Sequence, residues 1–217
     1  MNALMDEIRD FQREISEKVP SDVRALMAQC TAELEASGLA ARAMKAGDKI
    51  PDFTLPNQTG KSRRLYDLLA NGPVVLSIYR GGWCPYCNME MRALGNIIPQ
   101  LNALGATLIG MSPELPDKAI QTTLSNGAEI EVLTDIGCKV CQQLGLVFEL
   151  AEQLRPIYAQ FGIDIPAYNG DNSYKLPIPA TFVIGTDGTV HYAFVESDYT
   201  QRMEPQEVLE QVKAIVS

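Results

Sequence analysis

Apolar residues recur at helical spacing in the first part of the chain and predict two helices there. Helical periodicity brings every third or fourth residue to one face. The first stripe consists of Leu4, Ile8, Phe11 and Ile15, and the second of Val23, Leu26, Met27, Cys30 and Leu34. The composition changes near Ala46-Gly47-Asp48-Lys49-Ile50-Pro51. We therefore expect a helical extension over residues 1–45 and a separate domain over residues 46–217.

From residue 46 onward, runs of aliphatic and β-branched residues alternate with helical patterns. The run at 73–78 predicts a buried strand, followed by a helix at about 85–104 and a strand at 107–111. Further predicted elements are strands at 53–55 and 130–133, helices near 116–125, 138–144, 150–160 and 205–216, and a hairpin at 180–194 around Asp187-Gly188. This order predicts an α/β domain with a mixed sheet. We expect an irregular insert over 149–174.

Charge and cysteine content narrow the range of functions. The chain has 217 residues, of which 46% are apolar, and a formal net charge of −9. That charge argues against nucleic acid or an anionic membrane as a partner, and no apolar run is long enough to span a membrane. Acidic residues at positions 6 and 7, where a secretory leader carries lysines, predict a cytoplasmic protein. Five cysteines in that reducing compartment indicate catalysis or metal binding rather than structural disulfides.

Cys84 and Cys87 stand where the buried strand gives way to a helix, in Trp83-Cys84-Pro85-Tyr86-Cys87. Two cysteines at this spacing can close a small disulfide ring, and a helix N-terminus favours the thiolate. Pro85 suits the first helical turn, where its missing N–H would have no partner. Cys-x-x-Cys beside a βαβ unit is a redox signature, so we predict a reversible disulfide between Cys84 and Cys87.

Three segments of the chain resemble the peroxiredoxins, the alkyl hydroperoxide reductase/thiol-specific antioxidant superfamily. They are Gly47–Pro56, Leu133-Thr134-Asp135 and Thr181–Gly188, and the resemblance extends over residues 46–216. It implies a thioredoxin-like fold, with a mixed central sheet flanked by helices, and a thiol-dependent oxidoreductase that needs no cofactor. It also implies a hydroperoxide or a disulfide as substrate, and re-reduction by a thioredoxin- or glutathione-type donor.

Within this resemblance, the active-site loop departs from the peroxiredoxin pattern P-x-x-x-T-x-x-C. Cys87 takes the peroxidatic position, Cys84 replaces the threonine and Arg80 replaces the proline. Pro179 stands where peroxiredoxins carry an arginine, and it resembles the cis-proline of thioredoxins. We therefore expect the peptide bond before Pro179 to be cis and to pack against the cysteine turn. Trp83, Arg80 and Pro179 are then the residues expected to support or dock the substrate.

Two mechanisms remain open for the cysteine pair. In the thioredoxin mechanism an exposed Cys84 attacks a disulfide, and the deeper Cys87 resolves the mixed disulfide. In the peroxiredoxin mechanism Cys87 attacks the peroxide, becomes a sulfenic acid and condenses with Cys84. Both mechanisms end in the same disulfide. Cys84, Arg80 and Arg202 are the open candidates for holding the peroxide oxygens.

A second Cys-x-x-Cys, formed by Cys138 and Cys141, begins another predicted helix. Simple packing and an auxiliary redox role are both open for it. The four cysteines also leave a non-enzymatic, zinc-stabilised binding module as an alternative, but their pairs are spaced more widely than in a zinc ribbon, so we expect no metal. The single histidine, His191, lies in an alternating strand, which disfavours Cys–His chemistry.

The apolar stripe from Leu4 to Ile15 needs a cover, because an exposed apolar helix face is unfavourable in water. The domain over residues 46–217 could supply it. A second subunit in a homodimer could supply it equally well.

Overall fold

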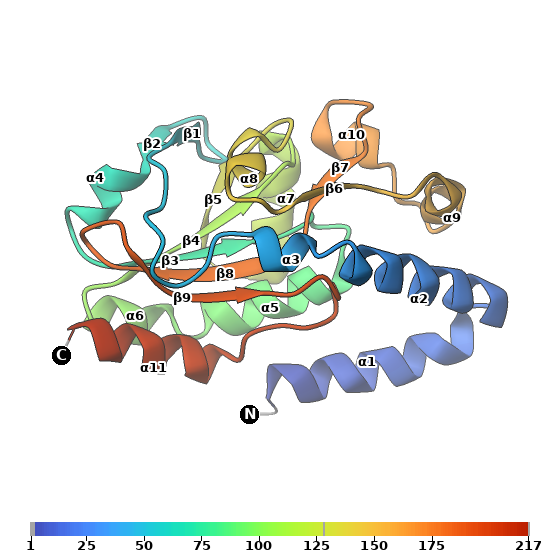
Figure 1. The fold of residues 1–217 in the computed structure, drawn as a ribbon, viewed down its shortest axis with the longest axis horizontal. Coiled ribbons are helices and arrows are strands. Elements are labelled where there is room, and N and C mark those ends of the chain that lie inside the picture. The colour runs from blue at the N-terminus through green and yellow to red at the C-terminus, as the bar shows by residue number, and fades with distance from the viewer. Residues whose placement is uncertain (1–2, 128, 217) are drawn as a thin grey trace.

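The computed structural model describes residues 3–127 and 129–216 (Figure 1). A five-stranded sheet forms its centre, in the order β5–β4–β3–β8–β9. Its strands are β3 (Val74–Ile78), β4 (Thr107–Ser112), β5 (Glu131–Thr134), β8 (Ala180–Ile184) and β9 (Val190–Val195). β3, β4 and β5 run parallel, whereas β8 is antiparallel to both β3 and β9. The predicted mixed sheet and its C-terminal hairpin are therefore confirmed.

Helices cover both faces of this sheet, as predicted (Figure 1). One face carries α1 (Leu4–Lys18), α5 (Pro85–Gly95), α6 (Ile98–Ala103), α7 (Pro116–Asn126) and α11 (Pro205–Val216). The other carries α3 (Leu39–Arg42), α4 (Leu65–Leu69), α8 (Lys139–Gln143) and the hairpin of β1 (Thr54–Pro56) and β2 (Ser62–Arg64). Every residue of β3 is buried because both of its faces are covered. Within the described ranges, no helix is long and apolar enough to cross a membrane.

The first helix packs on the same core as the sheet. Leu4 and Ile8 are buried in the cluster to which α5 contributes. The backbone N–H groups of Leu4 and Met5 donate to the carboxylate of Glu204 at 3.0 and 2.8 Å, which pairs the open N-terminus of α1. This part of the apolar stripe is therefore covered by the chain itself. The division at residue 45 and the homodimer stay predictions.

The second helix, α2 (Ser21–Ala36), behaves differently, because it has no fully buried residue. Its apolar residues Leu26 and Met27 pack only partly against a small cluster around Leu154 and Tyr158. In Figure 1, α1 and α2 form a helical hairpin beside one end of the sheet, and α2 runs below α9. The two helices of the extension are thus anchored through α1.

Residues 147–177 form an ordered insert, so the expectation of an irregular one is wrong. The insert contains β6 (Val147–Glu149), a short 3₁₀ helix η1 (Glu152–Leu154), α9 (Arg155–Gln160), α10 (Ile165–Asn169) and β7 (Lys175–Pro177). β6 pairs antiparallel with β7, and the Asp164 carboxylate accepts from the N–H of Ala167 at 3.0 Å, which caps α10. Pro166 and Gly170 interrupt the periodicity that would have revealed this helix.

The predicted helix at 85–104 is in fact two helices. α5 ends at Gly95 and α6 begins at Ile98. Pro99 has no N–H to donate to the carbonyl four residues earlier, so a continuous helix is broken at this point.

Candidate active site

The turn between β3 and α5 holds the two cysteines close to the sheet. Gly81 has a φ of 148°, a value that L side chains rarely adopt. A Cβ on Gly81 would lie 2.4 Å from Nε1 of Trp83, and one on Gly82 would lie 2.0 Å from Oγ1 of Thr122. Both glycines are therefore required for the chain to pass this close to Trp83 and to α7.

A buried carboxylate, Glu114, anchors this turn to the end of β4. It accepts hydrogen bonds from the N–H of Gly82 at 2.7 Å, from the hydroxyl of Tyr79 at 3.1 Å, and from the hydroxyls of Ser112 and Thr122 at 3.3 Å. Burial raises the pKa of Glu114, and these donors oppose the rise. Glu114 thus fixes the start of the cysteine turn without touching either sulfur.

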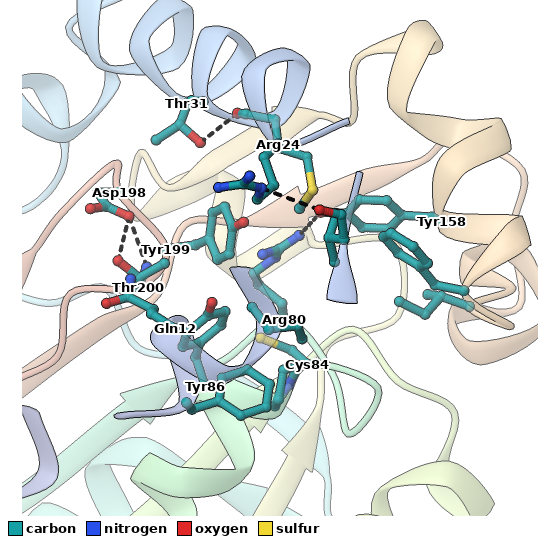
Figure 2. Close-up of a pocket in the computed structure, with 18 of the residues that line it drawn as sticks. Gln12, Arg24, Thr31, Arg80, Cys84, Tyr86, Tyr158, Asp198, Tyr199 and Thr200 are labelled. Carbon is teal, nitrogen blue, oxygen red and sulfur yellow. Dashed lines mark hydrogen bonds between the residues drawn. The ribbon is translucent and has the colours of Figure 1, made fainter. Parts of the chain in front are cut away.

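Cys84 is the N-cap of α5, and Cys87 lies in the first turn of that helix. Both thiols are free, and their residues are only 1% and 0% exposed. Of the two, Cys84 alone lines the large cavity at this site. The expectation of an exposed Cys84 is therefore wrong, because residues of α1 and α2 enclose the space into which it faces (Figure 2).

The two thiols titrate as an interacting pair. Burial disfavours the Cys84 thiolate, but a hydrogen bond from the Cys87 thiol, the charges of Arg80 and Arg202 and the Cys87 N–H outweigh it, so the pKa of Cys84 is lowered. Burial and the adjacent Cys84 raise the pKa of Cys87. The first proton lost by the pair therefore leaves the negative charge on Cys84.

Arg80 provides a buried cation inside a group of aromatic rings. Its guanidinium donates to the Tyr158 hydroxyl at 2.7 Å and lies 4.8 Å from the ring centroid of Trp83 and 4.5 Å from that of Tyr199. Burial opposes its charge, but Tyr158, Cys84 and Cys87 raise the pKa of Arg80. No carboxylate in the described parts of the chain forms an ion pair with Arg80. Its charge is therefore available to a thiolate on Cys84.

A second buried cation, Arg202, reaches Cys87 from the loop before α11. Its Nη2 lies 3.4 Å from Sγ of Cys87, and its Nε forms an ion pair with Oε2 of Glu90 at 2.7 Å. The hydroxyl of Thr181 donates to the other oxygen of Glu90 at 3.3 Å. Burial raises the pKa of Glu90 to about 7, although Arg202 opposes the rise. Of the arginines left open by the sequence, Arg80 thus lies in the Cys84 cavity and Arg202 lies beside Cys87.

A cavity of about 510 Å³ gives access to Cys84. Figure 2 shows Arg80 and Cys84 beneath α2, with Tyr158 and Tyr199 on opposite sides of Arg80. The lining of the cavity comes from the α1–α2 hairpin, from the cysteine turn, from α9 and the residues just after it, and from the loop at 198–200. The N-terminal extension is therefore part of the site.

This arrangement suits two-electron thiol chemistry. A thiolate is the nucleophilic form of cysteine, and the buried cations stabilise it. A sulfenic acid or a mixed disulfide on one cysteine can be resolved by the other, three residues away, with closure of the small ring.

Comparison with known proteins identifies the family. Residues 46–193 match the AhpC/TSA family. The chain belongs to the AhpC/TSA family. It is 28% identical over 174 residues to a putative peroxiredoxin of Mycobacterium tuberculosis, covering 80% of this chain and 99% of that relative. The thiol-disulfide oxidoreductase ResA of Bacillus thuringiensis is 24% identical over 162 residues, which cover 74% of this chain and 76% of ResA.

A solved structure supports the same assignment. The crystal structure of peroxidoxin BcpB from Mycobacterium tuberculosis matches with a TM-score of 0.63 and 27% identity, over 80% of this chain and 99% of that one. The thioredoxin-like fold is thereby confirmed, and the chain is a thiol-dependent oxidoreductase of the peroxiredoxin type. The region that matches the AhpC/TSA family begins at residue 46, so α1 and α2 lie outside it.

The Ile178–Pro179 bond is trans, so the prediction of a cis-proline is wrong. The chain runs on from β7 into β8, and the N–H of Ile178 donates to the carbonyl of Leu146 at 2.8 Å. An extended conformation is usual for the residue before a proline, and the chain does not need to reverse its direction at this point. Pro179 is buried at the start of β8 and does not line the Cys84 cavity. Its role in docking stays a prediction.

Cys138 and Cys141 lie on the opposite face of the sheet from Cys84 and Cys87. Burial, and then the charge of Asp135, raise the pKa of Cys138 to about 12 and that of Cys141 well above its usual value. These surroundings favour simple packing, and the auxiliary redox role stays a prediction. Among the described residues, no three His, Cys, Asp or Glu side chains gather in a way that could hold a metal ion.

The sequence did not reveal several residues that shape the site, namely Glu90, Glu114, Tyr158 and Tyr199. Glu90 could have been recognised from the sequence, because it is a charged residue within the otherwise apolar turns of α5 that face the core. No sequence pattern identifies the other three residues, since they come from separate segments and meet the cysteine turn only in the folded chain.

Proposed function

We propose that this chain reduces hydroperoxides with Cys84 as the attacking thiolate and Cys87 as the resolving thiol. One observation carries the proposal: of the two cysteines, Cys84 lines the cavity and has the lowered pKa. Arg80 and Trp83 support this thiolate and the oxygens of the substrate. A thioredoxin- or glutathione-type thiol then returns the electrons, in a cytoplasmic protein.

The proposed reaction balances in three steps. The Cys84 thiolate attacks the terminal oxygen of ROOH, the O–O bond breaks, and the alkoxide takes up the proton that Cys84 had released, which gives ROH and a sulfenic acid. The Cys87 thiol then attacks the Cys84 sulfur, so that an S–S bond forms and water leaves. Two thiols of the donor reduce this disulfide with two electrons and two protons, and the donor becomes a disulfide.

A second route has support of its own. The resemblance to peroxiredoxins implies that Cys87 takes the peroxidatic position, and the position of Arg202, 3.4 Å from its sulfur, supports that role. In that route Cys87 attacks and Cys84 resolves. The alternative substrate is a protein disulfide, which is supported by the likeness to a relative named as a thiol-disulfide oxidoreductase.

Trapping of the sulfenic acid separates these routes. Reduced Cys87→Ser and Cys84→Ser proteins are each mixed with hydroperoxide and dimedone, and the adduct is located by peptide mass spectrometry. In Cys87→Ser we expect a dimedone adduct on Cys84, with Cys84 oxidised as fast as the parent protein is oxidised by the same peroxide. In Cys84→Ser we expect only slow oxidation. A Cys87 adduct formed at the parent rate in Cys84→Ser would favour the second route. A parent protein that reduces a disulfide substrate but no peroxide would identify a disulfide reductase.

A further inference from the structure

We propose that the α1–α2 hairpin is a substrate-binding element that selects organic hydroperoxides with a bulky apolar body over hydrogen peroxide. The inference rests on the peroxidase activity proposed above and adds the substrate class. It assigns a role to the part of the chain that lies outside the region matched to the AhpC/TSA family.

The hairpin contributes about half of the cavity wall. From α1 come Phe11 and Ile15, and from α2 come Met27, Ala28 and Ala32, all facing the space that Cys84 also lines. Phe11 is held in place by the ring of Tyr86, edge to face with 5.5 Å between centroids. The cavity therefore joins a wall from the extension, which is partly apolar and also contains Gln12, Arg24, Thr31 and Glu35, to a reactive sulfur from the family domain.

The side of α2 that lines the cavity is not fully buried. The helix has no fully buried residue, and the residues that it presents to the cavity include the small Ala28, Thr31 and Ala32. A further cavity of about 270 Å³ lies along the same helix and shares Arg80, Tyr158 and Tyr199 with the first. An apolar concavity of this size with a few polar groups is typical of a small-molecule site.

The cavity offers apolar surface next to the reactive group. Arg80 and Cys84 lie beneath α2, where the peroxide group must be placed for attack (Figure 2). Away from the cysteine turn, the lining consists of the apolar side chains of the hairpin with Phe161 and Ile163 beyond α9, and also of the polar hairpin residues Gln12, Arg24, Thr31 and Glu35. Hydrogen peroxide has no group to fill this part, whereas the organic body of ROOH would be removed from water there. The chemical step is the one given above, with ROH leaving from the cavity.

The test fills the cavity from α2 without touching the cysteine turn. The variant Ala28→Phe/Ala32→Phe narrows the cavity. The matched control is Ala25→Phe/Ala36→Phe, because these two alanines are exposed on the same helix, as Ala28 and Ala32 are, but do not line the cavity. The rate of oxidation is followed by stopped-flow fluorescence of Trp83, which is the only tryptophan. Cumene hydroperoxide and hydrogen peroxide are the two substrates.

We expect Ala28→Phe/Ala32→Phe to lower the rate constant for cumene hydroperoxide by about tenfold or more, a loss of roughly 1.4 kcal/mol of binding. Its rate constant for hydrogen peroxide, and both rate constants of the control, should stay within about twofold of the parent. Equal losses for both peroxides, or no loss for either, would overturn the inference.

A binding measurement keeps this inference separate from the proposed peroxidase activity. The probe is 2-phenyl-2-propanol, the alcohol product, titrated into the reduced parent and into both variants with Trp83 fluorescence as readout. If the parent reduces neither peroxide, the peroxidase proposal fails and substrate selection fails with it. Binding to the parent and to the control but not to Ala28→Phe/Ala32→Phe would then still support the hairpin as a binding element, and equal binding to all three would overturn that as well.

Discussion

Replacing Arg202 by methionine tests the buried charges behind the cysteine pair. Arg202 and Glu90 are 1% and 3% exposed, and their ion pair has an N–O distance of 2.7 Å. Methionine fills much of the same volume but carries no charge. Removal of one partner leaves the other charge buried alone, which typically costs about 3–5 kcal/mol. We expect Arg202→Met to lower the free energy of unfolding by that order.

The pH dependence of this loss identifies its cause. Burial raises the pKa of Glu90 to about 7 from 4.5, so the folded parent binds its proton more tightly than the unfolded chain. Stability from this group therefore falls as pH rises through that interval and levels off above about pH 7. In Arg202→Met the opposing cation is gone and the pKa of Glu90 lies higher still. The deficit of the variant should thus grow above pH 7, by up to about 1.4 kcal/mol per pH unit.

Urea unfolding at about pH 6 and about pH 8.5 measures both quantities. All proteins carry Cys84→Ser and Cys87→Ser, so that no thiol of the pair titrates. Arg202→Lys is the control, because it keeps the charge while losing the contacts of Nη1 with the carbonyls of Tyr199 and Gln201. A deficit of Arg202→Met that is independent of pH and equal to that of Arg202→Lys would refute the charge argument.

Three further predictions concern the thiols and the turn. Alkylation of Cys84 by iodoacetamide should reach half its maximal rate below the ordinary thiol pKa of about 8.5, and Arg80→Met should move that midpoint upward by roughly 1 unit or more, as followed by mass spectrometry. Cys138→Ala and Cys141→Ala should leave the rate of peroxide reduction unchanged, because both thiols stay protonated; a folded variant without turnover would instead reveal an auxiliary redox role. Glu114→Gln should destabilise the fold by about 1–3 kcal/mol in urea unfolding, since its amide group faces donors where an acceptor is needed, and an unchanged midpoint would count against the anchoring role.

The sheet and the cysteine turn could be predicted because their signals are local. The apolar run at 73–78 and the Asp187-Gly188 turn each report their own conformation. The break at Pro99 was also local, but the apolar periodicity continues across it and favoured one long helix. The cis-proline was inferred from a resemblance at one position, while the actual conformation depends on β7 and its partner β6.

The surroundings of the cysteines could be predicted only in part. Arg202 was one of two candidate arginines, and nothing local brings it to Cys87, from which it is 115 positions away. The amphipathic pattern of α1 showed that one face is covered, but not by which element. The side of α2 that lines the cavity has no recognisable pattern in the sequence, because a cavity depends on the space between segments that are distant along the chain.

The central claim is that Cys84 and Cys87 are the redox pair of this chain. Its most direct test is peptide mapping of the reduced protein after oxidation by one equivalent of cumene hydroperoxide and alkylation of the remaining thiols. We expect one peptide that contains both cysteines, lighter by two hydrogen atoms and unalkylated, with Cys30, Cys138 and Cys141 alkylated. If Cys84 and Cys87 are both alkylated after the same treatment with cumene hydroperoxide, the claim that they form the redox pair is contradicted.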